Sequence, residues 1–287
     1  MFAAPLDMQF RLVVAATAIG FMVLEYATSR LAHRESHDLR ESAASVGIAV
    51  VQSVIRGLEA ALLAVPFALI YQHRLFDFDQ VSPLALIGLF LGTEFFYYWQ
   101  HRASHRVRWM WATHAVHHSP TKLNLTAAVR LGWTGNISGN FLFFLPLAWL
   151  GFHPYAIVAM LALNLLYQFF IHTEFAPRLG ILEWVLNTPS HHRVHHASNE
   201  PCLDKNYGGI LIVFDRLFGT FAVAPKDEPL RYGLVGGSPS YNPLRIAFGE
   251  WGAMFRSAYA AGSIGEFLRA LFGPPGADNA SRPAQQR

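Results

Sequence analysis

The stretch HRASHRVRWMWATHAVHH, residues 101–118, places five histidines within eighteen residues. It directly follows PLALIGLFLGTEFFYYWQ, residues 83–100, an apolar and aromatic run long enough to cross a bilayer as a helix. Imidazole is polar and titratable, so five imidazoles at the end of an apolar helix need a reason other than packing. The stretch therefore predicts a chemical site at the surface of a membrane protein.

The composition of the whole chain favours the same class. Of its 287 residues, 53% are hydrophobic and only 14% are charged, a balance that water-soluble domains rarely show. The formal net charge is only +3, with basic residues beside apolar segments, so no nucleic-acid partner is expected. Cys202 is the single cysteine, which excludes an intrachain disulfide and a cysteine-based metal site. A metal would need nitrogen and oxygen ligands.

The apolar segments predict an all-α integral membrane protein with about four to five transmembrane helices. Their approximate bounds are 12–31, 46–70, 83–100, 137–150 and 155–171. No basic region precedes the first segment, which favours a membrane helix over a cleaved signal peptide. Gly151 and Pro154 separate the last two segments, which we interpret as a helical hairpin.

The chain after this hairpin is less apolar, and we expect it to form a cytosolic, histidine-rich helical cap. It contains short β-like runs such as GGILIVF, residues 208–214. The stretch WGAMFRSAYAAGSIGEFLRALF, residues 251–272, has the spacing of a helix on the membrane surface. We expect one membrane-embedded domain over residues 1–272, with its histidine-rich core at about 94–221, and a disordered tail at 273–287.

Basic residues predict the orientation in the membrane, because cytoplasmic loops retain positive charge. Those that follow the first and third segments are Arg30, Arg34, Arg40, Arg102, Arg106 and Arg108. The loop between the second and third segments has only Arg74. The N-terminus is therefore expected outside and the histidines in the cytoplasm, with a bacterial inner membrane as the expected location.

Ten of the fourteen histidines lie between residues 101 and 196. They are His101, His105, His114, His117, His118, His172, His191, His192, His195 and His196. Spacings of three and four residues place several of them on common helical faces. Eight or more imidazoles at one membrane surface exceed what one ion coordinates, so the pattern predicts two metals. The four scattered histidines are expected to be interfacial anchors: His33, His37, His73 and His153.

The motifs HRASH, HAVHH and TPSHHRVHHASN, followed by LDKNYGG and DRLFGTF, resemble the fatty acid hydroxylase and sterol desaturase superfamily of membrane di-iron oxygenases. The resemblance runs from about Glu94 to Phe221. It implies two iron ions near the cytosolic face that use O2 to hydroxylate or desaturate a lipid, such as a sterol, a fatty acyl chain or an ether lipid. The ligands that it implies are His101, His105, His114, His117, His118, His172, His192, His195 and His196.

Two further ligand candidates accompany this resemblance. His191 lies about 100° around a helix from His192, and Gln168 stands where some relatives carry another histidine. Metal-bound imidazoles also need a partner for their second nitrogen. The candidates near enough in sequence for that role are Glu94, Glu174, Asn199 and Asp204.

Electrons are expected from a separate protein. No G-x-G-x-x-G loop follows a strand, and HPYA at residue 153 lacks the glycines of a cytochrome b5 haem motif. A ferredoxin or a cytochrome b5-type protein with its reductase is the expected donor. A basic face that includes Arg106, Arg108 and Lys122 would suit an acidic donor.

Two other classes of protein also use clustered histidines. A zinc-dependent hydrolase of membrane lipids is the main alternative, although each open zinc site needs only about three protein ligands. A metal transporter would hold its ligands near the bilayer midplane, whereas these histidines lie at helix ends. Iron with O2 consumption would indicate the oxygenase, and zinc with O2-independent turnover would indicate the hydrolase.

Overall fold

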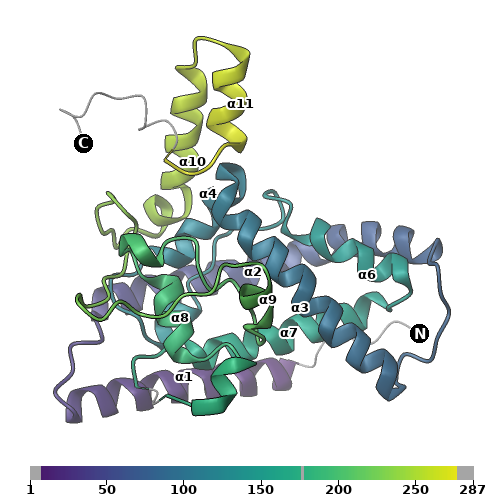
Figure 1. The fold of residues 1–287 in the computed structure, drawn as a ribbon, viewed down its shortest axis with the longest axis horizontal. Coiled ribbons are helices and arrows are strands. Elements are labelled where there is room, and N and C mark those ends of the chain that lie inside the picture. Colours follow the sequence, from purple (N-terminus) through teal and green to yellow (C-terminus); the bar gives the residue numbers. More distant parts are fainter. Residues whose placement is uncertain (1–7, 176–177, 277–287) are drawn as a thin grey trace.

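The computed structural model describes residues 8–175 and 178–276, and these are helical with irregular connections and no named strand. Four long helices run roughly along the long axis of the molecule (Figure 1). They are α1 (Met8–Leu31), α2 (Leu39–Gln72), α3 (Pro83–Arg106) and α7 (Pro154–Ile171). The all-α prediction is confirmed for the described residues. The predicted tail lies outside them from residue 277 onward.

The long helices begin at capping residues that the sequence supplies. The side chain of Asp38 accepts hydrogen bonds from the first amides of α2. Ser82 and His153 cap α3 and α7 in the same way, and each is followed by a proline at the first helical position. These caps fix where each apolar segment starts.

Within residues 8–175 and 178–276, two helices are long and apolar enough to cross a membrane, Leu12–Leu31 and Pro154–Ile171. A third candidate is the pair Leu39–Glu59 and Leu62–Gln72, which is bent by 46°. Only 17% of the first candidate span and 22% of the second are buried inside the protein, so most of their apolar surface faces outward. By length and composition, the described residues thus contain two or three candidate spans, fewer than the four to five predicted.

The two remaining predicted segments differ from a simple span. In the described residues, the segment 137–150 is helical only as η1 (Asn140–Phe144) and α6 (Leu145–Leu150). The third segment forms α3 as predicted, but Glu94 and Gln100 lie within that apolar run and lower its hydropathy. Between α6 and α7, the predicted turn is present, with Gly151 at a φ of +119°. A side chain there would collide with the carbonyl oxygen of Phe76.

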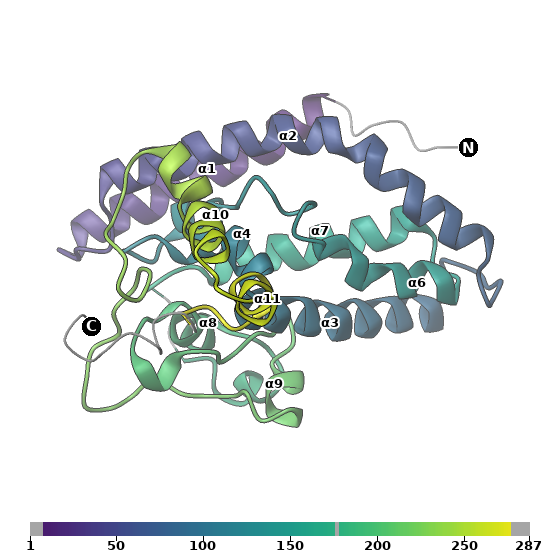
Figure 2. The ribbon, with the colours of Figure 1, turned by 90° about the horizontal axis from the view of Figure 1, so that it is seen from above.

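Short helices at one end of the long helices form a cap (Figure 2). They are α4 (Arg108–His118), α5 (Leu125–Ala128), η2 (Gly180–Trp184), α8 (Pro189–His196), η3 (Glu200–Cys202) and α9 (Val213–Leu217). An apolar core beneath it joins α2, α3, α6 and α7. Its buried residues are Phe67, Leu89, Phe144, Leu147, Ala148 and Ile157.

The β-like interpretation of GGILIVF is wrong. The run contributes one isolated bridge, between Leu186 and Leu211, and then enters α9. Its amides are taken by buried carboxylates: Ile210 and Leu211 donate to Glu94, each at 2.8 Å, and Gly208 donates to Asp215 at 2.7 Å. Amides used in this way are not free to form a strand ladder.

The predicted surface helix at 251–272 is two helices, α10 (Pro243–Tyr259) and α11 (Ile264–Phe272). Together they form a hairpin that projects from the body beside α4 (Figure 1). Trp109 of α4 packs edge to face on Trp251 of α10, with ring centroids 4.9 Å apart. The hairpin covers Arg108, which is 8% exposed and donates to the carbonyl oxygen of Ala270. Arg108 is therefore absent from any exposed basic docking face.

Candidate metal centre

Nine histidines come together beside the cap. They lie in α3, α4 and α8 and at the residue directly after α7. The imidazoles separate into two groups, and within each group the ligand atoms lie within 4.8 Å of one another. The five-histidine group contains His101, His105, His114, His118 and His195. The four-histidine group contains His117, His172, His192 and His196. All nine are buried except His114, which is partly exposed.

The pattern H-x-x-H-H occurs in α4 and again in α8, and each copy supplies both groups. In α4, His114 and His118 join the five-histidine group, while His117 joins the four-histidine group. In α8 the assignment is reversed. His192 and His196 join the four-histidine group, and His195 crosses to the other. Residues four apart share a helical face, and the residue between them points about 60° to 100° away.

The reactive nitrogens lie unusually close together. In the four-histidine group, Nε2 of His172 lies 3.1 Å from Nε2 of His117 and 2.9 Å from Nε2 of His192. Nε2 of His196 lies 3.1 Å from the same atom of His192. In the five-histidine group, the Nε2 atoms of His101 and His114 are 3.0 Å apart.

Backbone carbonyl oxygens fix which ring nitrogen carries the proton. Nδ1 of His101 lies 2.8 Å from the carbonyl oxygen of Tyr207, and Nδ1 of His195 lies 2.9 Å from that of Lys205. In the other group, Nδ1 of His117 and Nδ1 of His172 face carbonyl oxygens at 3.3 and 2.6 Å. A carbonyl oxygen only accepts, so each Nδ1 donates. Each Nε2 of a neutral ring then presents a lone pair.

Protonation does not relieve this arrangement near neutral pH. Burial lowers the pKa of His117 to about 4, although its hydrogen bond to the Arg130 carbonyl acts in the opposite direction. Burial also lowers the pKa values of His172 and His192 well below 6.5. The facing Nε2 atoms of His117 and His172 are therefore two lone pairs with no proton between them, an arrangement that a cation would stabilise.

Other nitrogens in the five-histidine group point to the same need. Among the described residues, the buried Nε2 atoms of His105, His118 and His195 have no hydrogen-bond partner. A buried polar atom without a partner costs free energy, whereas a metal ion would use the lone pair directly. The donor set, nitrogen only, suits iron, zinc or copper. The residues present thus fit two metal ions, one in each group.

A buried aspartate that the sequence did not single out helps to orient a ring of the five-histidine group. Asp215 accepts hydrogen bonds from the amides of Tyr207 and Gly208 at 2.8 and 2.7 Å and from the Thr220 hydroxyl at 2.7 Å. These bonds hold the carbonyl of Tyr207, which orients His101. The signal was present in the DRLFGTF motif, which follows the last histidines.

A buried arginine helps to orient a ring of the four-histidine group in a similar way. Arg130 is fully buried, and its guanidinium donates to the Ser45 hydroxyl, the Ser119 hydroxyl and the Glu41 carbonyl oxygen, each at 3.0 Å. Its own carbonyl oxygen faces Nδ1 of His117. Nothing in the local sequence identifies this role, since the contacts with Ser45 and Glu41 join segments more than eighty residues apart.

Two of the four residues predicted to support the imidazoles lie near the centre. Asp204 lies 3.7 Å from Nδ1 of His105 and pairs with Arg106 at 2.7 Å. Glu94 reaches the loop after α8 and accepts from Asn164, Ile210 and Leu211, so it stabilises the cap on the bundle without touching an imidazole nitrogen.

The other two serve loops away from the imidazoles. Asn199 donates to the Pro229 carbonyl oxygen and accepts from the Arg231 amide. The carboxylate of Glu174 faces the hydroxyl of Tyr232. Proximity in sequence predicted neither contact, because both partners come from the segment after α9.

The two further ligand candidates also point elsewhere. The ring of His191 packs on Phe221, and its Nδ1 lies 3.4 Å from the Thr188 amide at the start of α8. The side chain of Gln168 accepts from the Tyr97 hydroxyl at 2.9 Å and donates to Asn164. Both the oxygen and the nitrogen of the Gln168 side-chain amide are thus occupied. Only the backbone carbonyl oxygen of Gln168 contacts a histidine of the metal centre, His172.

Comparisons with known proteins agree with this geometry. The family model described as fatty acid hydroxylase matches residues 86–220. Alkylglycerol monooxygenase of Xenopus tropicalis is 36% identical over 258 residues, covering 89% of this chain and 56% of the relative. The human alkylglycerol monooxygenase is 41% identical over 204 residues, or 71% of this chain and 45% of the relative.

A more distant relative is the ornithine lipid hydroxylase OlsE of Rhizobium tropici, which is 28% identical over 193 residues, or 66% of this chain and 58% of the relative. The chain thus spans about half the length of the curated relatives that it matches. No solved structure matches it.

Proposed function

Because the chain belongs to the fatty acid hydroxylase and sterol desaturase superfamily, we propose that it is a membrane-bound di-iron oxygenase that hydroxylates or desaturates a lipid with O2. The observation that carries the proposal is the convergence of neutral imidazoles: Nε2 of His172 lies 3.1 Å from Nε2 of His117, with both Nδ1 atoms committed to carbonyl oxygens. Opposed lone pairs at this distance favour a bound cation.

The ligands of this proposal are the nine histidines of the two groups, five for one iron and four for the other. When bound, the two irons would activate O2 for the oxidation of an alkyl C–H bond, which no side-chain acid or base achieves at neutral pH. Carbonyl oxygens hold the rings of His101, His117, His172 and His195 in one tautomer, and Asp204 lies beside Nδ1 of His105. Such partners orient metal-bound imidazoles.

The oxygenase is proposed as one membrane domain over residues 1–272, with α3 and the hairpin of α6 and α7 entering the bilayer beside α1 and α2. The arginines around the cap favour a cytoplasmic position for the histidines. The named relatives come from animals and from a bacterium, so the comparisons give a bacterial inner membrane no support over another membrane.

The partners of this proposal are a lipid, O2 and a separate electron donor of the ferredoxin or cytochrome b5 type. Hydroxylation places one oxygen atom of O2 in the C–H bond and releases the other as water, which requires two electrons and two protons. The relatives named for alkylglycerols and for ornithine lipids support a lipid substrate. A zinc hydrolase would need about three ligands per ion, fewer than either group offers.

Isotope labelling tests the proposal. The chain is expressed under 18O2 in a host with a compatible electron donor, and the lipid extract is analysed by mass spectrometry. We expect an 18O-labelled hydroxyl, or a loss of two hydrogens, that disappears in His192→Ala and His101→Ala. His73→Ala, an exposed imidazole at the far end of α2, is the control and should keep the activity. A product that forms without O2, or that carries oxygen from water, would contradict the proposal.

A further inference from the structure

An open hollow of about 540 Å³ lies where the α1–α2 loop meets the segments after α4 and α7. The charged and aromatic side chains that line it are Arg34, Lys122, Arg231, Glu35, Glu174 and Tyr232. A second hollow of about 330 Å³ also includes Arg34, Glu35 and Lys122, so the two are neighbours. Neither hollow belongs to the metal centre described above.

The position of the hollow relates it to both the membrane and the metal centre. One apolar span ends at Leu31, just before Arg34, and another ends at Ile171, just before Glu174. The two spans pack against each other through Phe21 and Phe170, whose ring centroids are 5.1 Å apart. The hollow therefore lies at the depth of lipid head groups. Glu174, which lines the hollow, is two residues after His172 of the four-histidine group.

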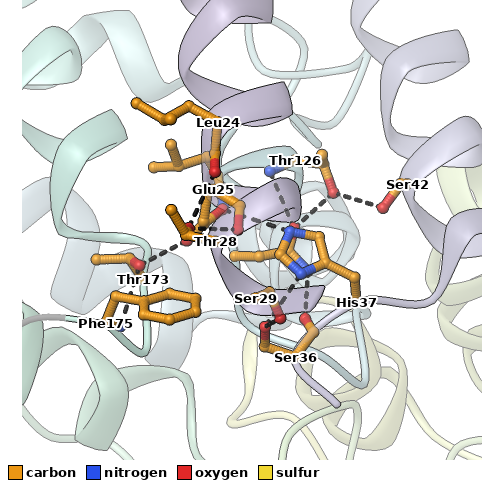
Figure 3. A network of polar contacts seen from close by, with 12 residues as sticks. Leu24, Glu25, Thr28, Ser29, Ser36, His37, Ser42, Thr126, Thr173 and Phe175 are labelled. Carbon is orange, nitrogen blue, oxygen red and sulfur yellow. Dashed lines mark hydrogen bonds and ion pairs between the residues drawn. The ribbon is translucent and has the colours of Figure 1, made fainter. Parts of the chain in front are cut away.

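Buried polar groups hold the walls in place (Figure 3). Glu25, which is 8% exposed, accepts from the Leu125 amide at 2.7 Å and from the Thr173 hydroxyl at 2.5 Å, and lies 3.5 Å from Nε2 of His37. His37 is thus a buried partner of a carboxylate and not the interfacial anchor that we expected.

Two further contacts fix the residues that carry the charges. The hydroxyl of Ser29 donates to the carbonyl oxygen of Arg34 at 3.0 Å, which sets the α1–α2 loop. The carboxylate of Glu41 accepts from the amide of Thr121 at 3.0 Å and from its hydroxyl at 2.8 Å, next to Lys122. The hollow is therefore largely pre-formed, as ligand sites usually are.

Among the described residues, Arg34 and Lys122 form no direct salt bridge, although the Glu174 carboxylate interacts electrostatically with both. Arg34 donates to a neutral acceptor, the Glu174 carbonyl oxygen, at 3.3 Å and lies over the Phe175 ring. Within the described part of the chain, Lys122 makes no hydrogen bond or ion pair. The Glu174 carboxylate faces the Tyr232 hydroxyl. Arg231 pairs with Glu228, and Glu35 lies exposed on the rim.

We propose that this hollow binds a phosphate or carboxylate group on the lipid substrate, through Lys122 and Arg34, while the hydrocarbon chain enters the membrane domain. The inference rests on the proposed function and narrows its substrate class to anionic lipids. Cations that form no direct salt bridge at head-group depth attract an anionic group of a lipid. Because the walls are already fixed, less conformational entropy is lost when the lipid binds.

Binding of a matched lipid pair tests the inference. Native mass spectrometry of the detergent-purified full chain compares hexadecylglycerol phosphate with neutral hexadecylglycerol. We expect wild type to favour the phosphate by about tenfold, the size of one or two partly exposed ion pairs. Lys122→Gln should remove most of this preference, and Lys122→Arg should keep it. Lys226→Gln, an exposed lysine outside both hollows, is the matched control.

Each outcome bears on a separate proposal. Equal binding of both lipids, or an unchanged preference in Lys122→Gln, would overturn the inference. Displacement of the lipid by millimolar inorganic phosphate would also overturn it, because the site would then be one for a free anion. Oxidation of lipids without any preference for a charged head group would support the oxygenase and contradict the anionic-lipid site. A preference that depends on Lys122, with no oxidation in the iron-loaded protein supplied with O2 and a competent electron donor, would contradict the oxygenase and leave an anionic-lipid site.

Discussion

The ring of His172 is oriented by the backbone of Gln168 and not by its side chain: Nδ1 of His172 lies 2.6 Å from the Gln168 carbonyl oxygen. The side-chain amide of Gln168 points instead to Tyr97 and Asn164. A substitution that removes the side chain but keeps the carbonyl therefore separates the two roles.

Gln168→Ala should leave the metal content unchanged while lowering stability. Two hydrogen bonds are lost, and the expected cost is about 1–2 kcal/mol. Metal analysis and thermal unfolding of detergent-purified protein measure the two effects. Loss of one metal ion per chain would show that the Gln168 side chain takes part in the centre after all.

The division of the histidines predicts which metal each substitution removes. His172→Ala takes a ligand from the four-histidine group and His114→Ala takes one from the five-histidine group. Each should lower the iron content from about two towards one per chain, because the other group keeps all its ligands. His191→Ala is the matched control, since its ring packs on Phe221 and should leave both ions bound. Equal loss of both ions in either variant would mean that the groups do not bind independently.

The resemblance to the superfamily implied the nine histidines as a set, yet nothing in the sequence predicted how they divide. His117 and His118 are neighbours in sequence, but they face different groups since successive helical residues differ by about 100°. Helical geometry alone could have separated the i, i+4 pairs from the residue between them. The partner group for each pair depends on how α4 and α8 pack, which is a tertiary property.

Residues that act through the backbone escaped prediction for a different reason. Arg130 and Asp215 hold carbonyl groups that orient imidazoles. Arg130 does so through contacts with the distant Ser45 and Glu41, whereas Asp215 binds amides seven and eight residues before it, which no residue spacing predicts. GGILIVF has strand-like side chains, but Glu94 and Asp215 take its amides, and no local pattern records where an amide finds its partner. Glu94 and His37 were likewise visible as polar residues near apolar helices, without any sign of what they would contact.

Asp215→Asn tests the backbone support of the five-histidine group. An amide cannot accept from all three donors that Asp215 satisfies, so at least one buried donor loses its partner. The expected cost is about 1–3 kcal/mol, with a partial loss of iron because Tyr207 no longer holds His101 firmly. Asp227→Asn, an exposed substitution on the following loop, should change neither quantity. Unfolding and metal content at wild-type values in Asp215→Asn would contradict this role.

The cap of α2 predicts a pH dependence of stability. Burial acts to raise the pKa of Asp38, but hydrogen bonds from Arg40, Glu41 and the Tyr241 hydroxyl outweigh it and leave the pKa below 3.8. A carboxyl group whose pKa is lower in the folded than in the unfolded state stabilises the folded protein at pH values above its unfolded-state pKa. This contribution is lost as the pH falls through the folded-state pKa.

Asp38→Ala should therefore be less stable than wild type by about 1 kcal/mol at neutral pH. The difference should shrink as the pH falls below about 4, the ordinary range of an aspartate. Asp38→Asn keeps a capping acceptor without a titrating group, so its stability relative to Asp38→Ala should not depend on pH in this way. Thermal unfolding in detergent between neutral and acidic pH measures these differences, and a constant gap between wild type and Asp38→Ala would contradict the argument.

Cysteine labelling tests the proposed orientation, and the burial of the native thiol makes it feasible. Cys202 is 0% exposed, so it should not react with a membrane-impermeant maleimide from either side. New cysteines at Asp77→Cys, between α2 and α3, and at Lys226→Cys, in the cap, then report the two faces. Because basic residues follow α1 and α3 but Arg74 alone lies in the α2–α3 loop, we expect Asp77→Cys to be labelled from outside intact cells. Lys226→Cys should be labelled only in inverted vesicles, and the opposite pattern would place the histidines outside.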